Sequence, residues 1–271
     1  MIGLTFAESI GSRCNRYWRI VGTGASFSLF GLGAATIALL LVVLVFPFPV
    51  SRARKQRYTR KTISRACWFY VRCMRFMGLL SFEFSGTEQL AAPGQLVIAN
   101  HPSLLDVIFL LSVMPDTNCI VKAGLWQNPF TFGVVSLAGY LRNDSDHLMD
   151  EAVNCLINGE RLIVFPEATR TSGNTIVFKR GAANLAVLSK CPLTPVLIDC
   201  YPPTLQKHEP WYKVPNSPPH FELKIQPTID VSRCIDTSRP RSIQVRHLTK
   251  YLLRYYQLQL EEIIAGSHHQ A

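Results

Sequence analysis

The apolar positions of the chain form one long uninterrupted run near the N-terminus. No residue from Ile20 to Ser51 carries a formal charge, and Ala34–Phe46 is apolar apart from one Thr. A transmembrane helix needs about 20 such residues, and one fits between Ala25 and Phe48. A cleaved signal peptide fits poorly, because prolines and a dense basic cluster follow the run instead of a small-residue cleavage site. The pattern predicts a helix that attaches the chain to a membrane.

A second helix is predicted over Tyr58–Leu80, where aromatic residues such as Trp68 and Phe69 are mixed with arginines. A segment of this kind lies in a membrane interface more readily than it crosses a bilayer. Packing against the domain that follows explains the same pattern equally well. The two helices could form a hairpin that enters one leaflet, or the first could span the bilayer alone. The sequence leaves both arrangements open.

Beyond residue 80 the pattern changes to short β-branched and aliphatic runs that alternate with helical ones, which is typical of an α/β domain. We expect a mixed, mostly parallel sheet flanked by helices over residues 81–271, and the membrane-attached helical hairpin over residues 1–80. The predicted strands are Phe82–Ser85, Gln95–Ala99, Asn118–Val121, Gly139–Arg142, Arg161–Phe165, Thr194–Asp199 and Phe221–Ile225. The predicted helices are Leu104–Val113, Asn128–Leu137, His147–Asn158, Lys179–Ser189 and Ile243–Ile264. A surface loop is expected over Tyr201–Pro219 and a disordered tail after Gly266.

The net charge of +10 is confined to the N-terminal segment. Twelve Lys and Arg lie between Arg13 and Arg75, whereas no acidic residue lies between Ser9 and Phe82. Basic residues beside an apolar run attract anionic headgroups, so the charge indicates membrane lipids as partners and not nucleic acid. The basic cluster after the run outweighs the three arginines before it. The positive-inside rule therefore predicts the C-terminal domain on the cytoplasmic face of the membrane.

The eight cysteines are scattered, without a CxxC pair or a histidine at zinc-ligand spacing. Spacings of that kind are what structural zinc sites show. The cysteines therefore predict small apolar side chains in a reducing compartment, and no metal site.

The candidate chemistry begins where a buried strand runs into a polar turn, in residues 100–106. His101 precedes Pro102, which keeps it out of helical geometry. Ser103 is a good N-cap, so Asp106 is expected in the first turn of the next helix. This arrangement lets the two side chains meet, so that a neutral His101 accepts a proton while Asp106 fixes its tautomer. The alternative is a capping box, in which Asp106 only satisfies backbone amides.

A second polar turn follows a strand in the run Phe165–Arg170. Glu167 can accept hydrogen bonds from a polyol or orient the turn, and Thr169 is a further polar candidate in it. Arg170 offers a forked donor for a phosphate or a carboxylate.

Three more cations are candidates for the same anion. Arg142 ends the preceding predicted strand, and Lys179 and Arg180 lie just before a helix N-terminus, which itself favours anions. The alternative for each of them is a solvated surface charge, since most Lys and Arg are exposed.

Four blocks in this order resemble the lysophosphatidate (1-acyl-glycerol-3-phosphate) acyltransferase family and its wider glycerolipid acyltransferase relatives. Asn100–Asp106 (NHPSLLD) resembles the catalytic NHxSxxD block of that family. Lys122–Arg142, which ends in AGYLR, resembles its second block, and Phe165–Arg170 (FPEATR) its FPEGTR block. Leu193–Val196 resembles its final Pro-Val strand. A single block would be weak support, whereas four in order indicate the family strongly.

The resemblance implies an O-acyltransferase that moves an acyl chain from acyl carrier protein or coenzyme A to a lysolipid hydroxyl, with 1-acyl-glycerol-3-phosphate as the leading acceptor. It implies that His101 is the general base and Asp106 its orienting partner. Glu167, Arg170 and Arg142 would contact the acceptor. A thiolate leaves readily, so direct attack needs no acyl-enzyme. We expect no cofactor, and acyl-coenzyme A or acyl carrier protein as co-substrate.

One residue departs from the family pattern, because Ala168 stands where the family usually has Gly. A methyl group there either excludes the left-handed backbone that Gly allows or narrows the pocket. Another acceptor, such as an amino-acid-linked lysolipid or a glycolipid, therefore stays open. A thioesterase or lipase would need an activated serine, but the sequence has no G-x-S-x-G elbow. A silent lipid-binding protein would not need these polar side chains together.

Overall fold

The short apolar runs after residue 80 form one seven-stranded sheet in the computed structural model, which describes residues 2–171 and 176–267. The strands are β1 (Ser81–Ser85), β2 (Leu96–Ala99), β3 (Thr117–Val121), β4 (Leu141–Arg142), β5 (Arg161–Val164), β6 (Leu193–Tyr201) and β7 (His220–Ile225). Their order across the sheet is β1-β7-β6-β2-β5-β3-β4. Neighbouring strands are parallel except for the antiparallel pair β6 and β7. The predicted mixed, mostly parallel sheet is confirmed.

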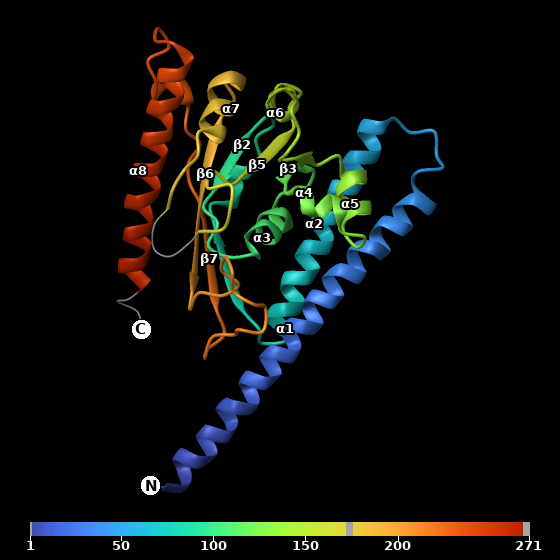
Figure 1. Cartoon of the computed structure of the whole chain (residues 1–271), viewed down its shortest axis with the longest axis vertical. Coiled ribbons are helices and arrows are strands. Elements are labelled where there is room, and N and C mark those ends of the chain that lie inside the picture. The colour runs from blue at the N-terminus through green and yellow to red at the C-terminus, as the bar shows by residue number, and fades with distance from the viewer. Residues whose placement is uncertain (1, 172–175, 268–271) are drawn as a thin grey trace.

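Helices cover both faces of this sheet (Figure 1). They are α1 (Ile2–Leu44), α2 (Arg52–Phe76), α3 (Asp106–Val113), α4 (Ala123–Gln127), α5 (Phe132–Ala138), α6 (Leu148–Ile157), α7 (Gly181–Ser189) and α8 (Arg241–Ser267), with 3-10 turns η1 (Thr87–Leu90) and η2 (Val231–Arg233). One apolar cluster joins the sheet to α6, α7 and α8, and another joins the opposite face to α2, α3 and α5. The last residues of the tail expected after Gly266 lie outside the described part.

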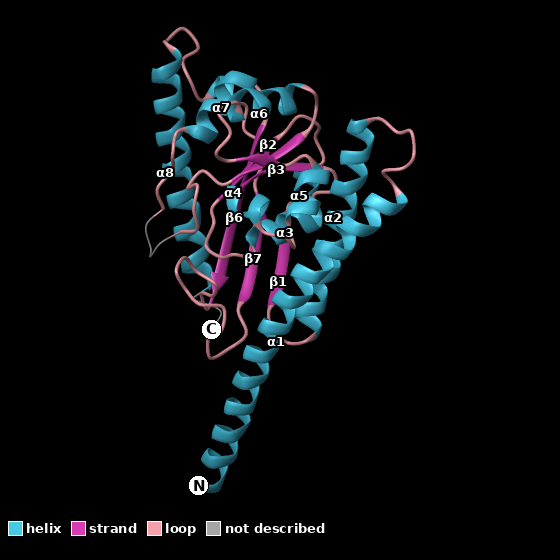
Figure 2. Cartoon of the chain, turned by 45° about the vertical axis from the view of Figure 1, so that its right-hand side comes forward, coloured by secondary structure: helices cyan, strands magenta, loops and turns pink. Residues whose placement is uncertain are grey.

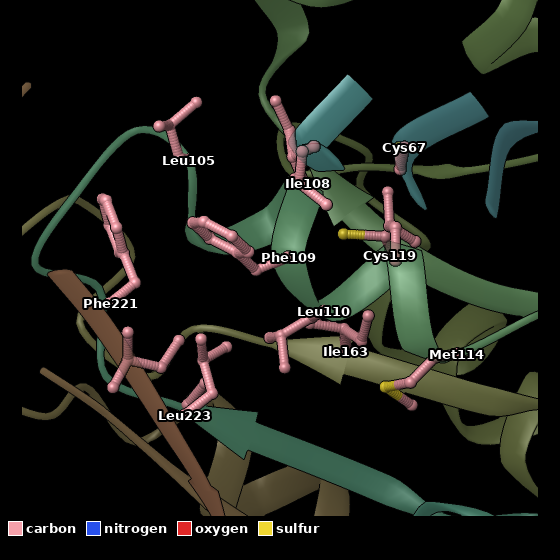
Figure 3. Packing of buried hydrophobic residues seen from close by; sticks show 14 of the residues in the cluster. Cys67, Leu105, Ile108, Phe109, Leu110, Met114, Cys119, Ile163, Phe221 and Leu223 are labelled. Carbon is pink, nitrogen blue, oxygen red and sulfur yellow. The ribbon is translucent and has the colours of Figure 1, made fainter. Parts of the chain in front are cut away.

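The cluster under α3 shows how that face of the sheet is packed. Phe109 is fully buried, and its ring centroid lies 4.7 Å from that of Phe221 on β7 (Figure 3). Cys67 of α2 belongs to the same cluster. Burial of each large apolar side chain contributes about 1.5 to 3 kcal/mol. The start of α3, from which the candidate site is built, is therefore firmly anchored.

The second predicted helix, α2, packs on the domain along one face. Cys67, Val71 and Met74 are buried there, whereas Trp68 and Phe69 on other sides of the helix are exposed. The predicted packing role is present, and the aromatic side chains remain free for an interface. The division into units at residue 80 stays a prediction.

The first helix, α1, begins well before the predicted position at Ala25 and ends at Leu44, before the two prolines that follow it. Within the described residues it is the one helix long and apolar enough to cross a membrane, over Asn15–Leu44. Its N-terminal part projects away from the domain (Figure 2). Farther along, α1 approaches α5 so closely that a Cβ on Gly133 would lie 2.6 Å from the Cβ of Ala38.

Two predicted elements near the second sequence block are wrong in extent. The helix expected from Asn128 begins at Phe132, because Pro129 holds Asn128 in an extended conformation with ψ of 121°. The chain also forms α4 just before it, which the pattern missed. The strand expected from Gly139 is only Leu141–Arg142, because Gly139 adopts a left-handed φ of 66° and ends α5.

Candidate active site

The side chains of His101 and Asp106 meet at the carboxyl end of β2. Nδ1 of His101 lies 2.8 Å from Oδ2 of Asp106, and the same oxygen accepts a 2.7 Å hydrogen bond from the backbone N–H of Ser103. The predicted turn-then-helix arrangement is therefore present. The predicted N-cap is wrong, however, because α3 begins at Asp106 and its N-cap is Leu105.

Burial differs between the two side chains, because the carboxylate of Asp106 is hidden and the imidazole of His101 is partly accessible. The Asp106 side chain is 0% exposed and the His101 side chain 16%. Burial raises the pKa of Asp106, and the hydrogen bond from His101 opposes that shift. Because Nδ1 carries the proton that faces the carboxylate, Nε2 is the free basic nitrogen of the ring. Asp106 thus acts on His101 as well as on a backbone amide, which is more than a capping box requires.

The FPEATR turn completes the surroundings of His101. Oε1 of Glu167 accepts hydrogen bonds from the backbone N–H of His101 (2.9 Å) and from Oγ1 of Thr171 (2.9 Å). The backbone N–H of Thr171 donates to the carbonyl of His101 at 2.7 Å. The Phe165 ring stacks on the imidazole with 4.2 Å between centroids. Glu167 was predicted either to accept hydrogen bonds from a polyol or to orient the turn, and these contacts correspond to the second role.

Arg170 reaches from the same turn to the loop between β6 and β7. Its Nη1 donates to the carbonyls of Leu205 (2.7 Å) and Gln206 (2.9 Å). The backbone N–H of Leu104 also donates to the carbonyl of Leu205. The Pro-rich loop is therefore held beside the turn that contains His101, and only part of the Arg170 fork is left for an anion.

The remaining predicted residues lie farther from the pair. Arg142 ends β4, and β5 and β3 separate that strand from β2. The guanidinium of Arg142 pairs with Asp144 at 3.0 Å. Lys179 and Arg180 are exposed, although the backbone N–H of Lys179 donates to Pro166. Thr169 makes no side-chain hydrogen bond within the described part of the chain. No group of three or more His, Cys, Asp or Glu in that part could hold a metal.

Comparison with known proteins places this geometry in a family. A family model described as Acyltransferase matches residues 81–199, which contain both polar turns. The 1-acyl-sn-glycerol-3-phosphate acyltransferase alpha of Mus musculus is 29% identical over 70% of this chain and 68% of its own length. The Saccharomyces cerevisiae 1-acyl-sn-glycerol-3-phosphate acyltransferase is 34% identical over 53% of this chain. Residues 81–199 therefore form an Acyltransferase domain.

These matches confirm the resemblance and the O-acyltransferase class that the four blocks predict. The crystal structure of the 1-acyl-sn-glycerophosphate (LPA) acyltransferase PlsC from Thermotoga maritima shares the fold, with a TM-score of 0.73, 20% identity, and 94% of this chain and 98% of that chain covered. The match spans only 50% of the yeast relative, so this acyltransferase chain corresponds to part of that protein. The apolar α1 agrees with the membrane association predicted for it.

Ala168, the departure from the acyltransferase family pattern, does not exclude the left-handed backbone. Its φ is 57°, so the turn keeps the conformation that Gly would adopt, and its side chain is exposed. The first of the two predicted consequences is therefore wrong. The alanine stores strain in the turn, because a Cβ in this region meets the following carbonyl oxygen.

Several residues of the acyltransferase site were not predicted. Thr171 bonds Glu167, and the ring of Phe165 stacks on that of His101. Asn100 bonds both the N–H and the carbonyl of Ile198 on β6. The signal for Phe165 was present, since it is the last residue of the predicted strand before the turn. The contacts of the β6–β7 loop depend on a long connection, which leaves no periodic pattern to follow.

Proposed function

We propose that the chain transfers a fatty acyl group from an acyl thioester to the hydroxyl of a lysophospholipid, with 1-acyl-glycerol-3-phosphate as the acceptor and His101 as general base. One observation carries the proposal: a fully buried Asp106 bonds Nδ1 of His101 at 2.8 Å and leaves Nε2 free on a ring whose side chain is 16% exposed. That is the arrangement a base needs in order to take a proton from a bound hydroxyl.

The proposed reaction is a direct attack. Nε2 of His101 takes the proton as the acceptor oxygen forms a bond with the thioester carbonyl carbon. The C–S bond then breaks, and the departing thiolate can take the proton from the imidazolium. Asp106 stabilises that imidazolium without becoming protonated itself. No nucleophilic side chain is required, because a thiolate is a good leaving group.

A large apolar cavity beside α3 supports a fatty acyl substrate. Its volume is about 490 Å³, and its walls come from α1, α2, α3, α5 and β3. Val107, the residue after Asp106, is part of the lining, together with Ile108 and Leu111. Pockets of some 300 to 1,000 Å³ with apolar walls accommodate ligands of this size. An acyl chain placed there would begin next to the catalytic pair.

The acceptor would bring its phosphate to the cationic side of the turn. The part of the Arg170 fork not bonded to the loop, and the exposed Lys179 and Arg180 near the N-terminus of α7, are the candidates. Mus musculus and Saccharomyces cerevisiae relatives carry the name of this acceptor. An amino-acid-linked or glycolipid acceptor is the alternative.

We further propose that the domain lies on the cytoplasmic face, with α1 and α2 entering one leaflet. Nε1 of Trp18 on α1 donates a hydrogen bond to the carbonyl of Met77, and the ring centroids of Phe30 and Tyr70 lie 5.6 Å apart. Because α1 contacts the domain along its apolar stretch, an upright span would draw the α/β unit into hydrocarbon. In inside-out bacterial vesicles, a tag after Ala271 should be open to protease, and protection of the tag would contradict this placement.

Acyl transfer tests the main proposal. Purified full-length protein in detergent would be given labelled acyl-coenzyme A or acyl carrier protein thioester with a panel of lysolipids. We expect transfer to 1-acyl-glycerol-3-phosphate, and a kcat about 10² to 10⁴ lower in His101→Ala. The exposed His247→Ala is the matched control and should keep wild-type activity. Release of free fatty acid without transfer would indicate a thioesterase, and undiminished transfer by His101→Ala would refute the base.

A further inference from the structure

Tyr256 of α8 carries its hydroxyl group into the middle of the sheet. The residue is 0% exposed, and its hydroxyl bonds backbone groups of the two neighbouring strands β2 and β6. Its hydroxyl donates a 2.6 Å hydrogen bond to the carbonyl of Ile98 on β2 and accepts a 3.2 Å bond from the backbone N–H of Val196 on β6. The one hydroxyl thus bonds both strands.

These two bonds lie just upstream of the catalytic turn. Ile98 is three residues before His101, and Asn100 between them bonds Ile198 on β6 through both atoms of its amide. The strand end from which His101 departs is therefore tied to β6 at two successive points. Tyr256 supplies one of these ties and Asn100 the other.

Tyr256 reaches the strands from the face opposite the reaction. It belongs to the apolar cluster of α6, α7 and α8, whereas the ring of His101 bonds Asp106 at the start of α3 on the other face (Figure 1). A contact of the phenol with substrate is therefore not needed for an effect on catalysis. The hydrogen-bonded path from the phenol to His101 runs through the backbone of β2.

The phenol is held in a single orientation. Its ring packs edge to face on Phe178, with 5.0 Å between centroids. Burial raises the pKa of Tyr256, so the hydroxyl keeps the proton that it donates. A hydroxyl with one donor and one acceptor bond, inside a packed core, is well suited to fix the distance between two strands.

We propose that Tyr256 is a positioning residue for His101, which fixes the carboxyl end of β2 against β6 and so keeps the imidazole in line with Asp106. This rests on the proposed role of His101 as the base. Misplacement of a catalytic group by about 1 Å can cost on the order of 10²-fold in rate. A side chain far from the substrate can therefore control kcat while leaving substrate binding unchanged.

The variant Tyr256→Phe removes the hydroxyl and keeps the ring. Tyr255→Phe is the matched control, because Tyr255 is its half-buried neighbour, whose hydroxyl bonds Gln226 at 3.3 Å. We expect Tyr256→Phe to lower kcat by about ten- to a hundredfold, with the KM for the acyl thioester and the KM for the lysolipid unchanged. Tyr255→Phe should match the wild type.

A second measurement does not depend on turnover. In histidine-labelled protein in micelles, the Nδ1 proton of His101 bonded to Asp106 should give a downfield NMR resonance that His101→Ala removes. We expect Tyr256→Phe to shift or weaken this resonance in folded protein and Tyr255→Phe to retain it. An unchanged resonance in Tyr256→Phe would overturn the positioning role, and so would a loss of thermal stability with unchanged kcat. If the wild type transfers no acyl group, the proposed function fails, and the resonance alone decides the role of Tyr256.

Discussion

Charged side chains gather where the parallel strands begin, which we call the amino edge, and where they end, which we call the carboxyl edge. The two groups differ in how completely their polar atoms are hydrogen-bonded. At the amino edge, Arg60 of α2 is 3% exposed and bonds Asp116 before β3 at 3.0 Å and Glu160 before β5 at 2.9 Å. Asn118 and Cys155 also donate to Glu160. At the carboxyl edge, Oδ1 of the buried Asp106 has no hydrogen-bond partner within the described residues.

We relate this difference to two roles: the Arg60 group stabilises the fold, and the His101 pair serves the proposed reaction. The Arg60 cluster bonds α2 to two turns of the sheet, with nearly every polar atom used. The His101 pair keeps a costly buried carboxylate that is only partly compensated, and it leaves one ring nitrogen free. Buried charge of this kind is typical of functional sites, where stability is given up for reactivity.

Removing Arg60 should have the largest effect on stability. Arg60→Met keeps the apolar stem but leaves Asp116 and Glu160 without their shared cation, and we expect a loss of about 3 kcal/mol in the free energy of unfolding. Activity per folded molecule should be retained. Chemical denaturation in detergent measures the first, and the acyl-transfer assay the second.

Arg57→Met is the control for this change. Arg57 bonds the other oxygen of Asp116 at 3.0 Å, but its side chain is 62% exposed. Such surface pairs contribute about 1 kcal/mol or less. Equal losses for the two variants would show that burial does not distinguish them, and a large loss of kcat in folded Arg60→Met would end the division of roles between the two edges.

Acid should shift the stability of the two edges in opposite directions. Burial raises the pKa of Asp106. The contribution of Asp106 to the free energy of unfolding is therefore present below its unfolded pKa and is lost as pH rises through its folded pKa. For Glu160, burial favours a higher pKa, but hydrogen bonds from Cys155 and Arg60 outweigh it and lower the pKa. Its contribution is present above the unfolded pKa and is lost as pH falls through the folded pKa.

Thermal unfolding at several pH values between about 3 and 6 tests these signs. Glu160→Gln should flatten the decrease in Tm on acidification. Asp106→Asn should gain Tm relative to the wild type as pH rises. Each effect should be smaller than that of Arg60→Met, because only one protonation changes. Parallel curves for the wild type and both variants would contradict the opposite signs.

The contacts at the carboxyl edge were easier to predict from sequence than those at the amino edge. His101 and Asp106 lie five residues apart, so a local turn was enough to predict that they meet. Arg60 and Glu160 are 100 residues apart, and they meet only after α2 has packed on the sheet. The same holds for Tyr256, whose two bonds join α8 to strands far earlier in the chain. Periodicity reports which face of an element is buried, but it does not report which distant polar atom that face will meet.

The smallest expected effect concerns the strained turn beside His101. Ala168→Gly should stabilise the fold by about 1 kcal/mol, because Gly adopts the observed φ of 57° without the Cβ clash. Ala91→Gly near the amino edge is the control: Ala91 is exposed with φ of −80°, so Gly there should only add unfolded-state entropy and lower stability by up to about 1 kcal/mol. Denaturation midpoints of the two variants should thus move in opposite directions. If Ala168→Gly also lowers stability, the turn is not strained, and the carboxyl edge differs from the amino edge only in its unpaired carboxylate.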